Sequence, residues 1–379
     1  MAKLGEVCKV SPSTKNIERQ GAWLLNLDMV EQQTGRVIEY KYVGEDDLNG
    51  SIIQFDTENV LYSKLRPNLN KVVLPPKDGF STSELLPLRP DASVLNKDYL
   101  AAFLRSDSFV TWAVSKTAGA KMPRLGTKDL MNAEIPVPSI EQQKKIAEKF
   151  KKLEQLISLR KQQLAKLDEL VKARFVEMFG EPVQNPNCWK TENLLDLGYC
   201  KNGMNFHRDD CGTEIHCLGV GDFKNHSTIR DVGSLPFISL NELPTSEYLL
   251  QDGDIVFVRS NGNKELVGRC LAIYPAKIPV TYSGFCIRYR LTSNKITVSY
   301  LLRVLKADSV RKKMTGRGAN IQNLNQQILA QLVVPIPPLS LQNQFAAFVE
   351  RVDQQKQTVQ QSLEKLELMK KALMQEYFG

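Results

Sequence analysis

The fold of this protein is decided by a stretch of sequence that occurs twice. The first copy, Ile135 to Gly180, reads IPVPSIEQQKKIAEKFKKLEQLISLRKQQLAKLDELVKARFVEMFG, and the second, Val334 to Gly379, reads VPIPPLSLQNQFAAFVERVDQQKQTVQQSLEKLELMKKALMQEYFG. The two copies align without a gap at a constant offset of 199 residues, and both end on Phe-Gly. A repeat of this length indicates a duplicated chain, in which a variable block is followed by a shared helical block, twice.

Each shared block predicts one long helix. In the first copy, Pro136 and Pro138 end the preceding element, and Ser139 is a good N-cap. Mostly apolar residues then recur in steps of four and three, which is a heptad seam that two cations interrupt in each copy. The seam positions are Ile146, Phe150, Leu153, Ile157, Arg160, Leu164, Leu167, Val171, Arg174 and Met178 in the first copy, and Phe345, Val349, Val352, Lys356, Val359, Leu363, Leu366, Lys370, Leu373 and Tyr377 in the second.

A helix of this length cannot bury such a seam alone, so each shared block needs a partner. The natural partner is the other copy, because the chain supplies it at high effective concentration. We expect an antiparallel pairing, which would place the two variable blocks at opposite ends of a rod. A coiled coil between two separate chains remains an alternative, since heptads specify the identity of the partner less well than they specify pairing.

Composition and length indicate a folded protein with more than one domain. The chain has 379 residues, of which 42% are hydrophobic and 24% charged, and its formal net charge is +8. This charge is compatible with a polyanionic partner but does not establish one. The N-terminus lacks the apolar core of a secretion signal, and no run of about 20 apolar residues occurs. Seven cysteines without a Cys-x-x-Cys pair fit reduced thiols, so we expect a cytoplasmic protein.

The two variable blocks predict small, mostly β domains. Glycines and prolines separate short runs that are rich in β-branched and aromatic residues. One helix is expected from Asp98 to about Lys116, with Asn96 or Asp98 as its cap. Strands are expected at Ile52–Phe55, Val60–Tyr62, Lys71–Leu74, Glu214–Val220, Asp254–Val258, Arg269–Tyr274 and Phe285–Leu291.

The predicted fold class is therefore α+β. It consists of two mixed, mostly β domains separated by a long antiparallel two-helix coiled coil, with a pseudo-two-fold internal duplication. We expect a first domain at 1–134, a central helix at 135–180, a second domain at 181–333 and a C-terminal helix at 334–379.

Basic and amide side chains gather in loops of both variable blocks. Arg and Asn form bidentate bonds to guanine and adenine edges, and lysines hold phosphates. For any single residue, a solvated loop whose Asn serves the turn is the alternative. The recurrence of such loops at matching places in both blocks favours a binding role, because base readers usually sit on loops held by a scaffold. The candidate DNA-binding residues are Lys64, Arg66, Asn68, Asn70, Lys71, Lys121 and Arg124 in the first block, and Arg259, Asn261, Asn263, Lys264, Arg317, Asn320, Gln322 and Asn323 in the second.

Metal and catalytic motifs give no comparable signal. The spacing of the histidines and cysteines in the second block matches no zinc finger, ribbon or knuckle, so we expect no metal. No phosphate-binding Gly-x-x-x-x-Gly-Lys loop, Asn-Pro-Pro-aromatic methyltransferase motif or glycine-rich cofactor loop occurs. We therefore expect no catalytic residues and no cofactor bound by this chain. The residues that invited the zinc hypothesis are Cys200, His207, Cys211, His216, Cys217 and His226.

Together these motifs resemble a known family. The helix starts IPVPSIEQQKKIAEKF and VPIPPLSLQNQFAAF, the runs VLYSKLRPNLNKV and FSTSELLPLRP of the first block, and DGDIVFVRSNGN and YSGFCIRYRL of the second are similar to segments of the specificity subunit of type I restriction-modification systems. The resemblance covers essentially the whole chain. The second helix start departs by having Leu341 where the first has Gln142, so the two junctions need not bind partners equally.

The resemblance implies a noncatalytic subunit whose two target-recognition domains each read one half of a split DNA sequence. The paired helices would fix the gap between the half-sites and dock two methyltransferase subunits. Those subunits would use S-adenosylmethionine to modify an adenine in each half-site, and motor-nuclease subunits would join for cleavage.

Two other classes of protein remain open on the sequence alone. One is an assembly scaffold, whose coiled coil recruits partners while the flanking domains bind protein. The other is a methyltransferase with an unusual motif, which would bind S-adenosylmethionine by itself. A protected bipartite DNA site would exclude the scaffold.

Overall fold

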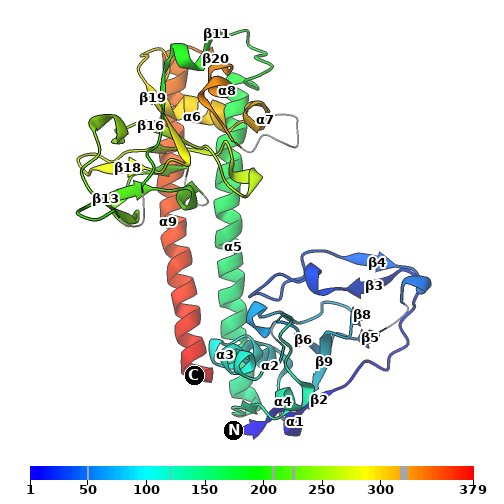
Figure 1. Cartoon of the computed structure of the whole chain (residues 1–379). Helices are drawn as coiled ribbons and strands as arrows, with labels where there is room; N and C mark the ends of the chain where they lie inside the picture. Colours follow the sequence, from blue (N-terminus) through cyan, green and yellow to red (C-terminus); the bar gives the residue numbers. More distant parts are fainter. Residues whose placement is uncertain (49–50, 120, 207–209, 224–226, 316–322) are drawn as a thin grey trace. The chain divides into compact units, whose positions relative to one another are not determined.

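The chain forms two compact units in the computed structural model, which describes all residues except 49–50, 120, 207–209, 224–226 and 316–322. Unit 1 comprises Met1–Gln162 and Val359–Gly379, and unit 2 comprises Gln163–Thr358. Each unit thus holds one variable block and a part of each long helix, and these helices are green and red in Figure 1. The division falls within the helices, whereas the sequence suggested boundaries at their ends.

The two shared blocks form the helices α5 (Ile140–Phe179) and α9 (Leu339–Phe378), of 40 residues each. α5 begins where predicted, because Ser139 Oγ accepts from the Gln142 N–H at 3.3 Å and Gln142 Oε1 accepts from the Ser139 N–H at 3.2 Å. This reciprocal pair is a capping box. α5 ends before Gly180, whose φ of 78° is left-handed and favours glycine.

The pairing of α5 with α9 is antiparallel, as predicted. In unit 1, the ring of Phe150 near the start of α5 stacks on Phe378 at the end of α9, with 5.9 Å between centroids. In unit 2, Phe175 near the end of α5 lies 5.5 Å from Phe345 near the start of α9. Early residues of one helix therefore face late residues of the other, within one chain.

All ten seam positions of each helix are buried or half-buried. The two lysines of the α9 seam face acidic partners on α5. Lys356 pairs with Asp168 in unit 2, and Lys370 Nζ lies 2.9 Å from Glu154 Oε1 in unit 1. In α5, Arg174 instead turns to Glu177 of its own helix, at 2.9 Å. Three of the four cations that interrupt the apolar seam, Arg174, Lys356 and Lys370, thus pair with carboxylates.

Unit 1 contains two four-stranded sheets, ordered β2-β9-β6-β7 and β4-β3-β8-β5. Within the second sheet, β3 pairs with β8 in parallel and with β4 antiparallel. A short β1–β10 pair joins the start of the chain to the segment before α5. The strands are β1 (Ala2–Lys3), β2 (Cys8–Val10), β3 (Ala22–Leu25), β4 (Lys41–Val43), β5 (Ile52–Phe55), β6 (Val60–Ser63), β7 (Val72–Val73), β8 (Gly79–Thr82), β9 (Leu85–Pro90) and β10 (Glu134–Ile135).

Unit 2 repeats this arrangement with a five-stranded sheet, β12-β19-β16-β17-β14, and a three-stranded sheet, β15-β13-β18. Its β13 again has one parallel neighbour, β18, and one antiparallel neighbour, β15. The strands are β11 (Lys190–Asn193), β12 (Gly198–Asn202), β13 (Thr213–Leu218), β14 (Thr228–Ile229), β15 (Phe237–Leu240), β16 (Asp254–Val258), β17 (Cys270–Ile273), β18 (Val280–Tyr282), β19 (Cys286–Leu291) and β20 (Val333–Ile336). The duplicated, mixed and mostly β fold predicted from the sequence is confirmed.

The single helix predicted from Asp98 to about Lys116 is wrong, because this segment forms two helices. Ser106 separates them, since its Oγ accepts from the Phe109 N–H at 3.3 Å and caps the second helix. Asn96 is the N-cap of the first helix, at 3.0 Å from the Tyr99 N–H. Apart from α5 and α9, the described residues form the α-helices α1 (Leu4–Val7), α2 (Lys97–Leu104), α3 (Asp107–Ser115) and α4 (Thr127–Met131) in unit 1, and α6 (Val298–Lys306), α7 (Asp308–Thr315) and α8 (Gln326–Ala330) in unit 2.

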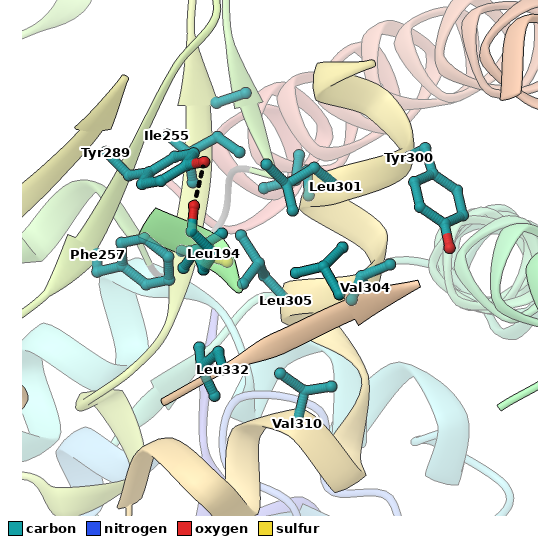
Figure 2. Close-up of a cluster of buried hydrophobic side chains, with 14 of the residues drawn as sticks. Leu194, Ile255, Phe257, Tyr289, Tyr300, Leu301, Val304, Leu305, Val310 and Leu332 are labelled. Atoms are coloured by element: carbon teal, nitrogen blue, oxygen red, sulfur yellow. Dashed lines mark hydrogen bonds between the residues drawn. The ribbon is translucent and has the colours of Figure 1, made fainter. Parts of the chain in front are cut away.

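The core of unit 2 lies between its larger sheet and these helices. Figure 2 shows Ile255, Phe257 and Tyr289 of the sheet facing Leu301 and Leu305 of α6. The hydroxyl of Tyr289 donates to the carbonyl of Leu194 at 2.8 Å, the dashed line in Figure 2. A buried tyrosine hydroxyl normally needs such a partner.

One buried glutamine in each unit joins the variable block to a long helix. Gln143 of α5 accepts from the Asn96 N–H at 2.8 Å and donates to the carbonyls of Val94 and Pro138, both at 2.8 Å. Both this glutamine and its repeat, Gln342, are 0% exposed.

Gln342 makes the same three bonds in unit 2. It accepts from the Thr297 N–H at 2.8 Å and donates to the carbonyls of Lys295 and Pro337 at 3.1 and 2.8 Å. Aromatic contacts repeat as well, because Tyr99 packs on Phe378 in unit 1 as Tyr300 packs on Phe179 in unit 2. The ends of the helices are therefore part of each unit's core.

A buried ion pair also recurs. Asp56 accepts from Arg89 Nη2 at 2.6 Å in unit 1, and Asp254 accepts from Arg290 Nη2 at 2.7 Å in unit 2. In unit 2 the pair joins the adjacent strands β16 and β19, and in unit 1 it joins the segment between β5 and β6 to β9. Neither pair follows from a sequence motif.

No helix among the described residues is long and apolar enough to cross a membrane.

Candidate nucleic-acid interface

In unit 1, three segments meet at one place through backbone hydrogen bonds. The Lys64 N–H donates to the carbonyl of Glu84 at 3.1 Å, and the carbonyl of Lys64 accepts from the Leu125 N–H at 2.9 Å. The Arg66 N–H donates to the carbonyl of Pro123 at 2.8 Å. The loop after β6, the turn between β8 and β9 and the basic loop before α4 therefore form one loop cluster, which we call cluster 1.

Two of the candidate side chains in cluster 1 are exposed on its loop after β6. Arg66 has a left-handed backbone with φ 50°, and Asn68 lies in the short turn Pro67–Leu69 that follows. The carbonyl of Asn68 accepts from Gln33 Nε2 at 3.0 Å, which ties the loop after β3 to the cluster. The backbone of this loop is thus held while the Arg66 and Asn68 side chains face solvent.

Asn70 does not share this exposure. It is 6% exposed, and its side-chain amide donates to the carbonyl of Arg105 at 3.0 Å. Such a side chain cannot reach a base edge without leaving the core, so we exclude Asn70 from the proposed interface. Lys71 is half-buried and donates to the carbonyl of Leu27. Burial lowers the pKa of Lys71, while the carboxylate of Asp28 acts in the opposite direction.

The basic loop of cluster 1 supplies two exposed cations, Lys121 and Arg124. Arg124 pairs with the Glu84 carboxylate, at 3.1 Å from Nη2 to Oε1 and 3.3 Å from Nε to Oε1. A carboxylate in this position orients the guanidinium, whose remaining donors face outward.

Unit 2 has the same backbone frame at the equivalent place, which we call cluster 2. The Arg259 N–H donates to the carbonyl of Phe285 at 2.7 Å, and the carbonyl of Arg259 accepts from the Leu324 N–H at 2.7 Å. Ser260 forms an isolated antiparallel β-bridge with Asn323, as Leu65 does with Arg124 in unit 1. Arg259, Phe285 and Asn323 thus correspond in position to Lys64, Glu84 and Arg124.

The candidate side chains of cluster 2 make different contacts from those of cluster 1. Arg259 is half-buried, and its Nη1 donates to the carbonyl of Gly284 at 3.3 Å. Asn261 Oδ1 accepts from the Asn263 N–H at 2.8 Å, and Asn263 Oδ1 accepts from the Glu265 N–H at 3.0 Å. Both asparagines therefore organise the turn that carries the exposed Lys264.

Of the remaining candidates, Asn323 is exposed in cluster 2. Arg317, Asn320 and Gln322 lie outside the described residues. The structure brings the described candidates of each unit into one cluster, and it adds two residues that the sequence did not single out, Gln33 and Phe285. Phe285 could have been found by aligning YSGF with FSTSE. Each run leads from a strand of one sheet to a strand of the other, β18 to β19 and β8 to β9.

The cysteines are mostly buried thiols. Burial raises the pKa of Cys8, Cys200 and Cys217 to about 12 each, so these thiols stay protonated at neutral pH. Among the described residues, no three His, Cys, Asp or Glu side chains gather as metal ligands would. His216 stacks on Phe237, with 4.0 Å between centroids. His207 and His226 lie outside the described residues.

Two copies of one mixed domain, each completed by the ends of two paired helices and each carrying a polar loop cluster on the same frame, define a duplicated recognition protein. Residues 1–169 and 214–368 match the family model described as the type I restriction modification DNA specificity domain. The chain belongs to this family.

Its relatives carry the same description. The StySPI specificity subunit of a type I restriction enzyme from Salmonella potsdam is 30% identical over 288 residues, covering 70% of this chain and 60% of that protein. The MjaVIII specificity subunit from Methanocaldococcus jannaschii is 24% identical over 318 residues, covering 79% of this chain and 73% of that protein. The alignment thus spans less than two thirds of the Salmonella protein.

Solved structures share the fold. The type I restriction-modification S subunit from M. genitalium superimposes with a TM-score of 0.59 at 14% identity, over 100% of this chain and 95% of that one. A chain from a structure of a type I restriction-modification system gives a TM-score of 0.60 at 16% identity, over 100% and 96%.

Proposed function

We propose that this chain is the DNA sequence-specificity subunit of a type I restriction-modification complex. The observation that carries the proposal is the recurrence of one backbone frame in clusters 1 and 2, with unlike side chains. A scaffold that holds two loop clusters in the same way while varying what they present is suited to reading two different sequences. Membership of the specificity family supports the same conclusion.

Each unit would read one half of a bipartite target. Arg66, Asn68 and Arg124 of cluster 1 carry groups of the kind that recognise guanine and adenine edges in the major groove, and Lys121 would hold a phosphate. The continuous helices α5 and α9 would set the separation of the half-sites, since each contributes residues to both units. The chain itself would be noncatalytic.

The partners we propose are double-stranded DNA, two methyltransferase subunits and motor-nuclease subunits. S-adenosylmethionine would be bound by the methyltransferase, and no cofactor by this chain. The complex would act in the cytoplasm, where its DNA lies. The duplicated helix ends offer two similar docking places for paired partners.

A footprint of the chain with its methyltransferase on DNA tests the proposal. We expect two short protected stretches separated by a gap of constant length, and adenine methylation in each. Affinity should fall steeply with salt, because phosphate contacts release counterions. Protection without sequence preference, or no protection, would contradict the proposal. Mapping methyladenine across the genome of a host with the complex would identify the two half-sites.

An assembly scaffold is the second candidate, and one observation favours it. Helices α5 and α9 expose apolar side chains in unit 1, with Leu159 and Leu368 at 58% and 69% exposure. Such residues suit a protein partner. The scaffold and the specificity subunit differ in the footprint, since a scaffold would assemble the partners and leave no bipartite protection.

A further inference from the structure

We infer that Phe285 reads the methyl group of a thymine in the half-site recognised by unit 2, and that the turn carrying it is where the two units acquire different base preferences. This inference rests on the proposed function. It concerns one position of a shared frame, at which the two units present opposite chemistry.

The position is the same in both units. In unit 1 it is Glu84, in the turn between β8 and β9, and in unit 2 it is Phe285, in the turn between β18 and β19. The carbonyl of Glu84 accepts from the Lys64 N–H at 3.1 Å, and that of Phe285 accepts from the N–H groups of Arg259 and Ser260 at 2.7 and 3.4 Å. The turn is therefore a fixed part of each cluster.

The turn of unit 2 is held closely. The Phe285 N–H donates to Ser283 Oγ at 3.3 Å, and Arg259 Nη1 donates to the carbonyl of Gly284 at 3.3 Å. A Cβ on Gly284 would lie 2.1 Å from Asn205 Oδ1, so the backbone of the turn sits directly against its neighbour. The backbone that carries Phe285 is therefore placed before any ligand arrives.

The two side chains then diverge. The Glu84 carboxylate engages Arg124, so cluster 1 presents a charged, hydrogen-bonding pair. In cluster 2 this pair cannot form, because Asn323 stands where Arg124 does and Phe285 where Glu84 does. Phe285 is 61% exposed. A single exposed apolar side chain is common on protein surfaces, but this one occupies the position of Glu84 in the shared frame, where it is open to an apolar group of a ligand.

In the major groove, the apolar group that distinguishes one base is the C5 methyl of thymine, and phenylalanine is one of the side chains that contact it. Guanine, cytosine and adenine present only donors and acceptors there. The inference therefore commits unit 2 to at least one A·T pair in its half-site, contacted from the thymine side. At the corresponding place cluster 1 has Glu84, whose carboxylate holds Arg124, a side chain suited to guanine.

Replacement of thymine by deoxyuridine, which lacks only the methyl group, tests this directly. The full chain is assembled with its methyltransferase, and each thymine of the unit 2 half-site is replaced in turn in a duplex that carries the mapped target. At one position, wild-type affinity should fall about fourfold, the contribution of one buried methyl-sized group. Phe285→Ala should bind the thymine and deoxyuridine duplexes equally.

Two controls accompany the test. Phe237→Ala removes a ring of similar exposure, 58%, which packs on His216 outside cluster 2, and it should keep the fourfold difference. Phe285→Ala should also retain wild-type discrimination at the unit 1 half-site, which shows that the complex is folded. A half-site without an A·T pair, no sensitive thymine in the wild type, or sensitivity that persists in Phe285→Ala would each overturn the inference.

The outcome separates this inference from the proposed function. If the wild-type complex binds a scrambled duplex as tightly as the mapped target, the proposed function fails and this inference fails with it. If the wild type prefers its target but ignores the methyl groups, the assignment of Phe285 alone is wrong.

Discussion

In unit 1, Gln143 of α5 makes three hydrogen bonds, two to the variable block and one to Pro138 before the helix, and in unit 2 Gln342 of α9 makes the equivalent three. In the loop clusters the two units agree only in their backbones, since Glu84 and Arg124 give way to Phe285 and Asn323. Few side chains can replace these glutamines, because a buried backbone group left without a hydrogen bond costs its full desolvation free energy. A solvated loop tip has no such constraint. The junctions therefore stay alike while the clusters differ.

The largest expected effect is at the junctions. Gln143→Ala and Gln342→Ala should each lower the free energy of unfolding by about 3–5 kcal/mol, because three buried backbone groups lose their partners. Chemical denaturation measures this. Gln155→Ala and Gln344→Ala, at exposed glutamines of the same helices, should stay within about 0.5 kcal/mol. If only one junction proves sensitive, the two are not equivalent.

The next effect sharpens the difference between the clusters. The double substitution Arg66→Ala with Asn68→Ala should weaken binding to the mapped target by roughly 10- to 100-fold, because bidentate base contacts are lost. Recognition should relax at the unit 1 half-site alone, as read by methylation of randomised duplexes. Lys9→Ala, an exposed cation on β2, serves as the matched control. Equal relaxation at both half-sites would show that the clusters do not act separately.

A smaller effect concerns acid stability. Burial raises the pKa of Asp56, but the bonds from Arg89, Ser13 and the Glu58 N–H together hold it below its ordinary value. A depressed pKa contributes stability that is complete above the unfolded value of about 4 and is lost as pH falls through the folded value.

Unit 1 should therefore lose stability below about pH 4. Asp56→Asn should cost about 1–3 kcal/mol at neutral pH and flatten this loss in thermal unfolding curves. The exposed Asp47→Asn is the control. A wild-type curve that is already flat between pH 5 and about 2 would contradict the role of this pair.

The smallest effect lies on the surface of the paired helices. Lys161 and Glu367 are 3.1 Å apart, with 57% and 48% of their side chains exposed. Lys161→Ala should change the free energy of unfolding by less than about 0.5 kcal/mol, and less at high salt. A loss comparable to that of Gln143→Ala would mean that surface charges, rather than buried polar bonds, hold unit 1 together.

The sequence predicted the elements whose periodicity is strong. The heptad seams predicted both long helices. With Ser139 as the cap the start of α5 was given within a residue, whereas α9 begins at Leu339, five residues after the expected start at 334. Runs of β-branched residues gave β5 and β16 at their observed bounds. It missed the break at Ser106, because the apolar pattern continues across the cap. It also gave no sign of β3 and β4, which pair with each other, nor of the pairing of β3 with the distant strand β8.

The candidate site was predicted less well, for a physical reason. Residue type indicates which groups can bind a base, but only tertiary contacts decide which of them face solvent. Arg66 and Asn70 are equally polar in the sequence, and both have left-handed backbones, yet the first is exposed and the second is buried against Arg105. Phe285 was overlooked because the sequence assigned it to a strand, Phe285–Leu291, in which an aromatic residue usually belongs to the core, whereas β19 begins at Cys286.

The way the helices are shared also sets an order of events during synthesis. The core of unit 1 includes Phe378, whose ring packs on Tyr99 and whose carbonyl accepts from Ser108 Oγ at 2.6 Å. The ribosome makes those partners about 270 residues before it makes Phe378. Unit 1, which is translated first, is therefore completed last. Until segment 359–379 leaves the ribosome, the apolar face of α5 in unit 1 stays exposed to solvent.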